Sequence, residues 1–156
     1  NNNNKNFDID YAKQVIKEVK EIGFRVRTSF IFDLPTTTKE DMQKTINFIL
    51  ETEPDEIRGH FLALRLGTTI YNKLAKEKEI PTQYIHSDKP LIENEKYTNS
   101  EMLQDIETLI SKLKDKEYKI VKNVKEWENL ESLRNKEGKI KFLSFCPSKY
   151  GIDWEK

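Results

Sequence analysis

The stretch that decides the fold occupies residues 23–71. It reads GFRVRTSFIFDLP at residues 23–35, TTTKEDMQKTINFILET at 36–52 and PDEIRGHFLALRLGTTIY at 54–71. Alternating apolar and polar side chains predict strands at residues 24–33 and 56–64, and helical spacing predicts a helix between them and another after Gly67. Two strands joined through such a helix run parallel, because a tight hairpin cannot join them. The order strand, helix, strand, helix therefore predicts the α/β fold class.

Polar caps predict where the helices begin. Asp8, followed by an apolar side chain every three or four residues, predicts a helix before the first strand, and Gly23 follows it where a left-handed backbone is favoured. Threonine caps predict the starts of three further helices, two of them with an acidic residue three positions later, as in a capping box. These caps are Thr38 with Asp41, Thr68, and Thr98 with Glu101.

The second half of the chain is predicted to extend this unit. Residues 81–97 are charged and interrupted by Pro90, which predicts an irregular connection. Apolar spacing predicts a helix from residue 98 to about residue 116, and alternation predicts a tail strand at residues 139–145. We therefore divide the chain into a βα unit at residues 1–80, the connection at 81–97 and a helical extension at 98–156. The extension also has a short helical stretch with Val124, Trp127, Leu130 and Leu133.

Composition argues against several classes of partner. The 156 residues carry 27 basic and 27 acidic side chains, a balance that favours neither nucleic acid nor an anionic membrane. No apolar run reaches the roughly 20 residues of a membrane-spanning helix and no signal peptide is visible, so we expect a cytoplasmic protein. Cys146 is the single cysteine. It excludes an internal disulfide, no metal site is expected, and the residue is either half-buried in the tail strand or a reactive thiol.

One parity of the two predicted strands is polar. Arg27, Ser29 and Asp33 share a face of the first strand, and Arg58 and His60 share a face of the second. The aromatic parity of the first strand is expected to pack against helices. A polar face in a dry core would be costly, so this one either lines a site or forms an exposed edge of the sheet.

Four short motifs, in order, resemble the later half of radical SAM (S-adenosylmethionine) enzymes. They are FIFDLP at residues 30–35, TKED at 38–41, PDEI at 54–57 and LGTTIY at 66–71, and the resemblance covers residues 7–74. The chain departs from the family pattern at Asp33, where glycine is usual, and at Arg65 and Leu66, where a proline is common. The family also binds a [4Fe–4S] cluster through three cysteines in a C-x₃-C-x₂-C loop, which this sequence lacks.

The resemblance implies that the chain supplies the last two strands of a partial (βα)₆ barrel. The parent enzyme would cleave S-adenosylmethionine reductively with its cluster, on a substrate that the sequence does not reveal, and this chain alone is expected to be inactive. The same resemblance implies that the polar strand face lines the pocket for S-adenosylmethionine and substrate. The pocket residues would be Arg27, Ser29, Asp33, Arg58 and His60, with no catalytic residue assigned.

Other interpretations stay open. Arg27, Asp33 and Arg58 could neutralise one another across the strands, and His60 could be a structural histidine. The chain could instead be a stand-alone module that binds a small anion or a protein without catalysis, or another α/β fold whose similarity is accidental. Open strand edges predict a partner in either case, either the missing N-terminal half of a barrel or a second copy of the chain.

Overall fold

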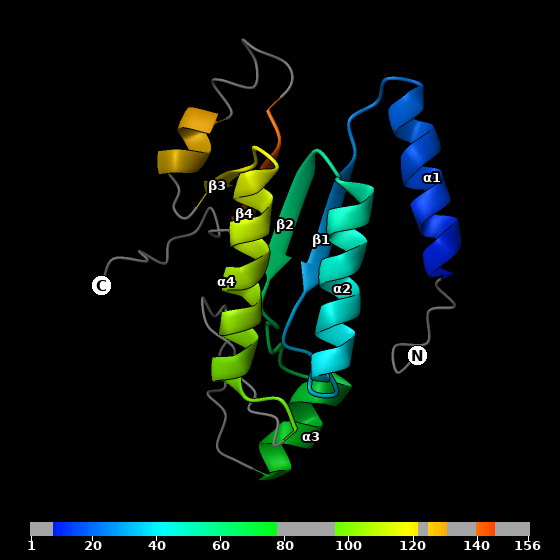
Figure 1. Ribbon diagram of the computed structural model, residues 1–156. Coiled ribbons are helices and arrows are strands. Elements are labelled where there is room, and N and C mark those ends of the chain that lie inside the picture. Colours follow the sequence, from blue (N-terminus) through cyan, green and yellow to red (C-terminus); the bar gives the residue numbers. More distant parts are fainter. Residues whose placement is uncertain (1–7, 78–95, 122–124, 131–139, 146–156) are drawn as a thin grey trace.

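The computed structural model describes residues 8–77, 96–121, 125–130 and 140–145 (Figure 1). The first half contains α1 (Ile9–Glu21), β1 (Arg27–Ile31), α2 (Lys39–Thr52), β2 (Glu56–His60) and α3 (Thr69–Glu77). The second half contains α4 (Asn99–Asp115), β3 (Lys119–Val121), helical residues 125–130 and β4 (Phe142–Phe145). None of the helices in these ranges has the length and apolar character needed to cross a bilayer.

The four strands form one parallel sheet in the order β1-β2-β4-β3. The predicted α/β class and the parallel pairing of the first two strands are confirmed, with Thr28 opposite Ile57 and Phe30 opposite Gly59. The predicted tail strand is present as β4 and lies in the interior of the sheet, between β2 and β3. No prediction covered β3, a strand of three residues. The sheet is open, and closure into a barrel is not seen within the described residues.

Both predicted strands of the βα unit are shorter than expected. The sequence predicted residues 24–33 and 56–64, whereas the ladder covers Arg27–Ile31 and Glu56–His60. Side chains end the ladder on both sides. The carboxylate of Asp55 accepts the backbone N–H of Val26 at 2.8 Å, and the carboxylate of Asp33 accepts the backbone N–H of Leu62. The alternation of apolar and polar residues continues past these points in the sequence. The ladder ends there because carboxylates, in place of backbone carbonyls, accept the backbone N–H groups.

The main core lies between one face of the sheet and the helices α2 and α4, which stand side by side over it (Figure 1). Ile57 and Leu143 contribute from the sheet, and Leu109 and Leu113 from α4; all four are fully buried. Phe32 belongs to the same core, and Phe30 packs against it, as the aromatic parity predicted. Helical residues 125–130 belong to a second, smaller cluster with Val121 and Phe142, on the opposite face of the sheet.

The predicted helix caps are confirmed. Asp8 accepts the N–H groups of the first turn of α1, Thr68 Oγ1 accepts the N–H of Tyr71 at 3.2 Å, and Gly23 has a φ of +92°. Both capping boxes are complete, Thr38 with Asp41 on α2 and Thr98 with Glu101 on α4. Local sequence therefore sets the helix starts independently of the rest of the fold.

The first helix, α1, stands apart from the core. None of its residues is buried, and its apolar side chains Ile9 and Tyr11 are 49 % and 66 % exposed. It lies beside α2, next to the edge of the sheet that β1 forms (Figure 1). There Nζ of Lys13 lies 2.5 Å from Oε2 of Glu51 of α2. The apolar stripe that predicted this helix is therefore only partly covered.

Glu53 joins three elements at the end of α2. Its carboxylate pairs with Lys116, just after α4, and with Lys141, just before β4, at 3.0 Å for Lys141. The hydrogen bonds from these two ammonium groups lower the pKa of Glu53 to about 2 from its ordinary 4.5. Because the folded-state pKa is depressed, the stabilisation is present above pH 4.5 and is lost as the pH falls from there toward 2.

Replacement of Glu53 tests this junction. Glu53→Gln removes both ion pairs, and we expect a loss of about 1 kcal/mol at pH 7, a figure reduced for solvent screening because a third of the side chain is exposed. Urea unfolding at pH 7 and pH 2.5 measures it, and the difference from the parent should be much smaller at pH 2.5, where most of the stabilisation has been lost. Glu40→Gln, on an exposed pair with Lys44, is the control and should change little at either pH. An unchanged difference at pH 2.5 would contradict the assignment.

Gly59 is required by close packing in the core. A Cβ added there would lie 2.7 Å from Cε1 of Phe145 and 2.9 Å from Cε2 of Phe32. We expect Gly59→Ala to lower the free energy of unfolding by about 1–3 kcal/mol, as overpacked core substitutions do. Urea unfolding measures the loss, and Phe145→Leu in the same background should recover part of it. Ser29→Ala, on the exposed edge strand, is the control. No loss in Gly59→Ala would show that the rings move aside freely.

Candidate functional site

The predicted polar residues of β1 and β2 lie on one face of the sheet. Register places Arg27 opposite Glu56, Ser29 opposite Arg58 and Ile31 opposite His60. The alternate residues of the same strands, including Phe30 and Ile57, face the main core. Arg27, Ser29, Arg58 and His60 therefore come together on the face away from α2 and α4, which we call the polar face.

The carboxylate of Glu56 is at the centre of the polar face. Its Oε1 atom lies 2.6 Å from Nε of Arg27 and 3.0 Å from Nε of Arg58. The Glu56 side chain is 6 % exposed, whereas Arg58 is 24 % and Arg27 46 % exposed. A buried carboxylate needs such partners, since an uncompensated charge there would be costly. Sequence reasoning missed Glu56, although it shares the parity of Arg58 and His60.

Arg58 also has an aromatic neighbour. Its guanidinium carbon lies 4.9 Å from the ring centroid of Trp127, in a cation–π contact, and Trp127 in turn packs edge-on against Phe142. On its other side in the sheet, Arg58 is in register with Ser144 of β4. Ser144 is fully buried, and its hydroxyl has no hydrogen-bond partner among the described residues. Ser29, Arg58 and Ser144 therefore form a polar row across three strands.

Asp33 and His60 lie at the carboxyl ends of β1 and β2. Asp33 is 1 % exposed, and its hydrogen bond from the N–H of Leu62 joins the segments that leave the two strands. That contact is structural. His60 ends β2, is partly exposed, and accepts the backbone N–H of Phe32 through its carbonyl oxygen at 3.1 Å. Two of the predicted residues, Arg27 and Arg58, share Glu56 as a partner.

The polar face suits the binding of an oxyanion. A guanidinium carries five N–H donors in a planar fork, and each arginine here uses Nε toward Glu56. We call Arg27, Glu56 and Arg58 the charged triad. In it two guanidinium groups face one carboxylate, and this excess of positive charge favours binding of a second negative group. No cluster of three or more histidine, cysteine, aspartate or glutamate side chains that could hold a metal occurs in the described ranges.

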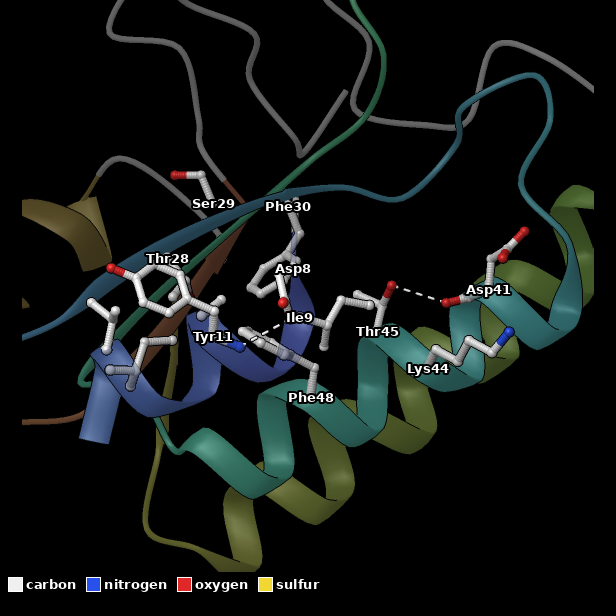
Figure 2. Close-up of a pocket in the computed structure, with 13 residues that line it drawn as sticks. Asp8, Ile9, Tyr11, Thr28, Ser29, Phe30, Asp41, Lys44, Thr45 and Phe48 are labelled. Carbon is white, nitrogen blue, oxygen red and sulfur yellow. Dashed lines mark hydrogen bonds between the residues drawn. The ribbon is translucent and has the colours of Figure 1, made fainter. Parts of the chain in front are cut away.

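A groove on the other side of β1 was not predicted. It has a volume of about 900 Å³ and lies between α1, β1 and α2 (Figure 2). Ile9 and Val15 line it from α1, Phe30 from β1 and Phe48 from α2. The apolar stripe of α1 was visible in the sequence, but its incomplete burial depends on where the helix packs. The groove and the polar face border the same strand, β1.

No protein-family model, curated protein or solved structure matches this chain.

The charged triad can be tested by double-mutant cycles. Glu56→Gln leaves two guanidinium groups facing a neutral amide, and we expect a loss of about 1–2 kcal/mol in the free energy of unfolding. Cycles with Arg27→Gln and Arg58→Gln should give the larger coupling energy for Arg58, because it is less exposed. Urea unfolding in low and high salt measures both. Salt should weaken mainly the Arg27 coupling, and a larger coupling for Arg27 would contradict the burial argument.

Proposed function

We propose that this chain forms the later part of a radical SAM catalytic domain, as a piece of a partial (βα) barrel, and that its polar face contributes to the pocket for S-adenosylmethionine and substrate. The main support is the parallel β1–α2–β2–α3 unit, which carries the family-like motifs in order: FIFDLP and TKED at the end of β1 and the start of α2, PDEI at the start of β2, and LGTTIY after β2. Ligands of parallel βα folds gather at the carboxyl ends of the strands, where three of these motifs lie together with Asp33 and His60. Arg27 and Glu56 begin their strands at the amino end of the same face.

The chain by itself does not fit the iron–sulfur cluster of that family. A [4Fe–4S] cluster needs several thiolates, and the sequence has Cys146 alone, which lies outside the described residues. Cluster chemistry would therefore belong to a separate, cysteine-bearing part of the enzyme. The residues described here would bind and orient the ligand.

Three residues of the polar face would have separate roles in binding. Arg58, which contacts Glu56 and Trp127, would donate two parallel hydrogen bonds to a carboxylate of S-adenosylmethionine or substrate. Arg27, the more exposed of the pair, would add a second positive charge. His60, at the carboxyl end of β2, could donate a hydrogen bond or carry a proton there.

The alternative function is binding of a small anion or a protein without catalysis. One observation favours it specifically: the triad has two guanidinium groups for one carboxylate, beside the buried Ser144 hydroxyl. Such a site needs neither a cluster nor a nucleoside. The two proposals differ in whether the adenosyl part of the ligand contributes to affinity.

Binding of S-adenosylmethionine separates the two proposals. Under the first, we expect the chain to bind S-adenosylmethionine and S-adenosylhomocysteine more tightly than phosphate or methionine, and Arg58→Gln to weaken binding about tenfold, the loss of one charge-assisted pair. Calorimetry measures the affinities. Lys17→Gln is the control, because it removes the same charge from an exposed pair with Glu21 on α1, away from the polar face. Phosphate binding that equals nucleoside binding would favour the anion module.

Reconstitution tests the missing cluster. Anaerobic incubation of this chain with iron and sulfide should give no stable four-iron cluster and no cleavage of S-adenosylmethionine. A stable four-iron cluster on this chain, or cleavage of S-adenosylmethionine by it, would contradict the proposal.

A further inference from the structure

The outer edge of β1 has backbone groups that point away from the sheet. The N–H of Glu56 donates to the carbonyl of Val26, and the N–H of Phe32 donates to the carbonyl of His60, both at 3.1 Å. In a parallel ladder, backbone groups alternate between the two sides, so those of Thr28 and Phe30 also face β2. The N–H and C=O groups of Arg27, Ser29 and Ile31 therefore face outward. The sheet order places no described strand beside them.

The groove lies next to this edge and is covered by α1. Ile9, Tyr11 and Val15 of α1 line it together with Phe30 and Phe48, and Figure 2 shows Ile9, Phe30 and Phe48 gathered around it. The α1 side chains are only partly covered, although their helix is strongly amphipathic in sequence. The half-covered face of α1, the apolar groove and the edge of β1, beside which no described strand lies, are contiguous.

We propose that this edge and groove accept one additional β-strand from a partner polypeptide. Its backbone would pair with Arg27, Ser29 and Ile31, and its inward side chains would fill the groove. The surface specifies the chemistry of that strand. Thr28 Oγ1 lines the groove and is buried without a hydrogen-bond partner among the described residues, which calls for a hydroxyl side chain opposite it. Arg27, 46 % exposed on the other side of the sheet, calls for a carboxylate.

A second copy of this chain fits the edge poorly. Antiparallel pairing of β1 with its copy around a two-fold axis keeps both helical layers on the same side of the joined sheet. The helices α1 and α2 lie on one side of the sheet, with α1 next to the edge formed by β1 (Figure 1). The two-fold rotation would therefore bring α1 of the copy close to α2, where the two helices would overlap. A single extended strand meets no such obstacle.

This inference does not depend on the proposed function. A strand-accepting edge is compatible with a radical SAM domain whose preceding part is a separate unit, and equally with a binding module. The measurements below use no nucleoside and follow the backbone amides of Arg27, Ser29 and Ile31, which binding of S-adenosylmethionine or phosphate to the side chains of the polar face need not protect. The outcome of the peptide experiment can therefore be told apart from that of the binding experiment.

A synthetic peptide tests the edge directly. The probe is Val-Glu-Thr-Glu-Val-Glu-Val with blocked ends, which carries apolar and hydroxyl side chains on one parity and carboxylates on the other. Hydrogen exchange of the chain is followed by NMR at about 1 mM peptide. We expect the amides of Arg27, Ser29 and Ile31 to exchange at least about tenfold more slowly with peptide, whereas those of Thr28 and Phe30 change less because they already pair with β2.

Two variants make the test specific. Ser29→Pro removes an outward N–H and keeps the ladder to β2, so it should abolish peptide protection without unfolding the chain; Ser29→Ala should bind normally. A Lys-for-Glu version of the peptide should bind at least about fivefold more weakly, as like charges at Arg27 repel. No protection by the probe, equal protection in Ser29→Pro, or slow exchange of the three outward amides before peptide is added would overturn the proposal. So would a dimer that Ser29→Pro dissociates.

Discussion

The fold depends on hydrogen bonding along both edges of β2. Its odd-numbered residues pair with β4 and its even-numbered residues with β1, so the strand joins the first and second halves of the sequence. Ile57 and Gly59, on the core side of β2, are therefore buried under α2 and α4. The absence of a side chain at Gly59 lets Phe32 and Phe145 meet there, with ring centroids 6.0 Å apart. The βα unit and the extension therefore both contribute residues to the main core.

Burial of β2 also explains the arrangement of charge on the polar face. Glu56 begins a strand that is covered on both edges, so its carboxylate is almost fully buried. It is accompanied by two arginines, one from its own strand and one from β1. This pairing fixes the orientation of Arg58, and Trp127 restricts it further. A preorganised guanidinium loses less side-chain entropy when a ligand binds. Structural neutralisation and ligand binding are therefore compatible roles for the same residues.

Local signals in the sequence predicted most of the elements, and long-range contacts decided the rest. The caps at Asp8, Thr38 and Thr98 act within one helical turn, so their residue types suffice to place α1, α2 and α4. The alternation of β1 and β2 likewise predicted which side chains share the polar face. The ends of these strands could not be predicted, because Asp33 and Asp55 close them through residues 29 positions away.

The interior position of β4 and the short strand β3 were equally inaccessible, since three residues carry no periodic signal and strand order is a tertiary property. The groove exists because α1 lies at some distance from the sheet, which the sequence does not specify. The role of Glu56 depends on its ion pair with Arg27 of β1, a contact between two strands. For the candidate site, parity predicted the shared face, while the ion pairs that organise it required coordinates. The proposed relationship to radical SAM enzymes still depends on the motifs of the sequence.

The place of β4 has a consequence for the order in which the protein can mature during synthesis. β2 is synthesised more than 80 residues before β4, the strand that pairs with its second edge and places Leu143 opposite Ile57. Until then the nascent chain presents Ile57 and Gly59 on an unfinished sheet, with a loop of that length still to close. Chaperones and aggregation would compete for this intermediate, so translation speed through the intervening residues should influence the yield of folded protein.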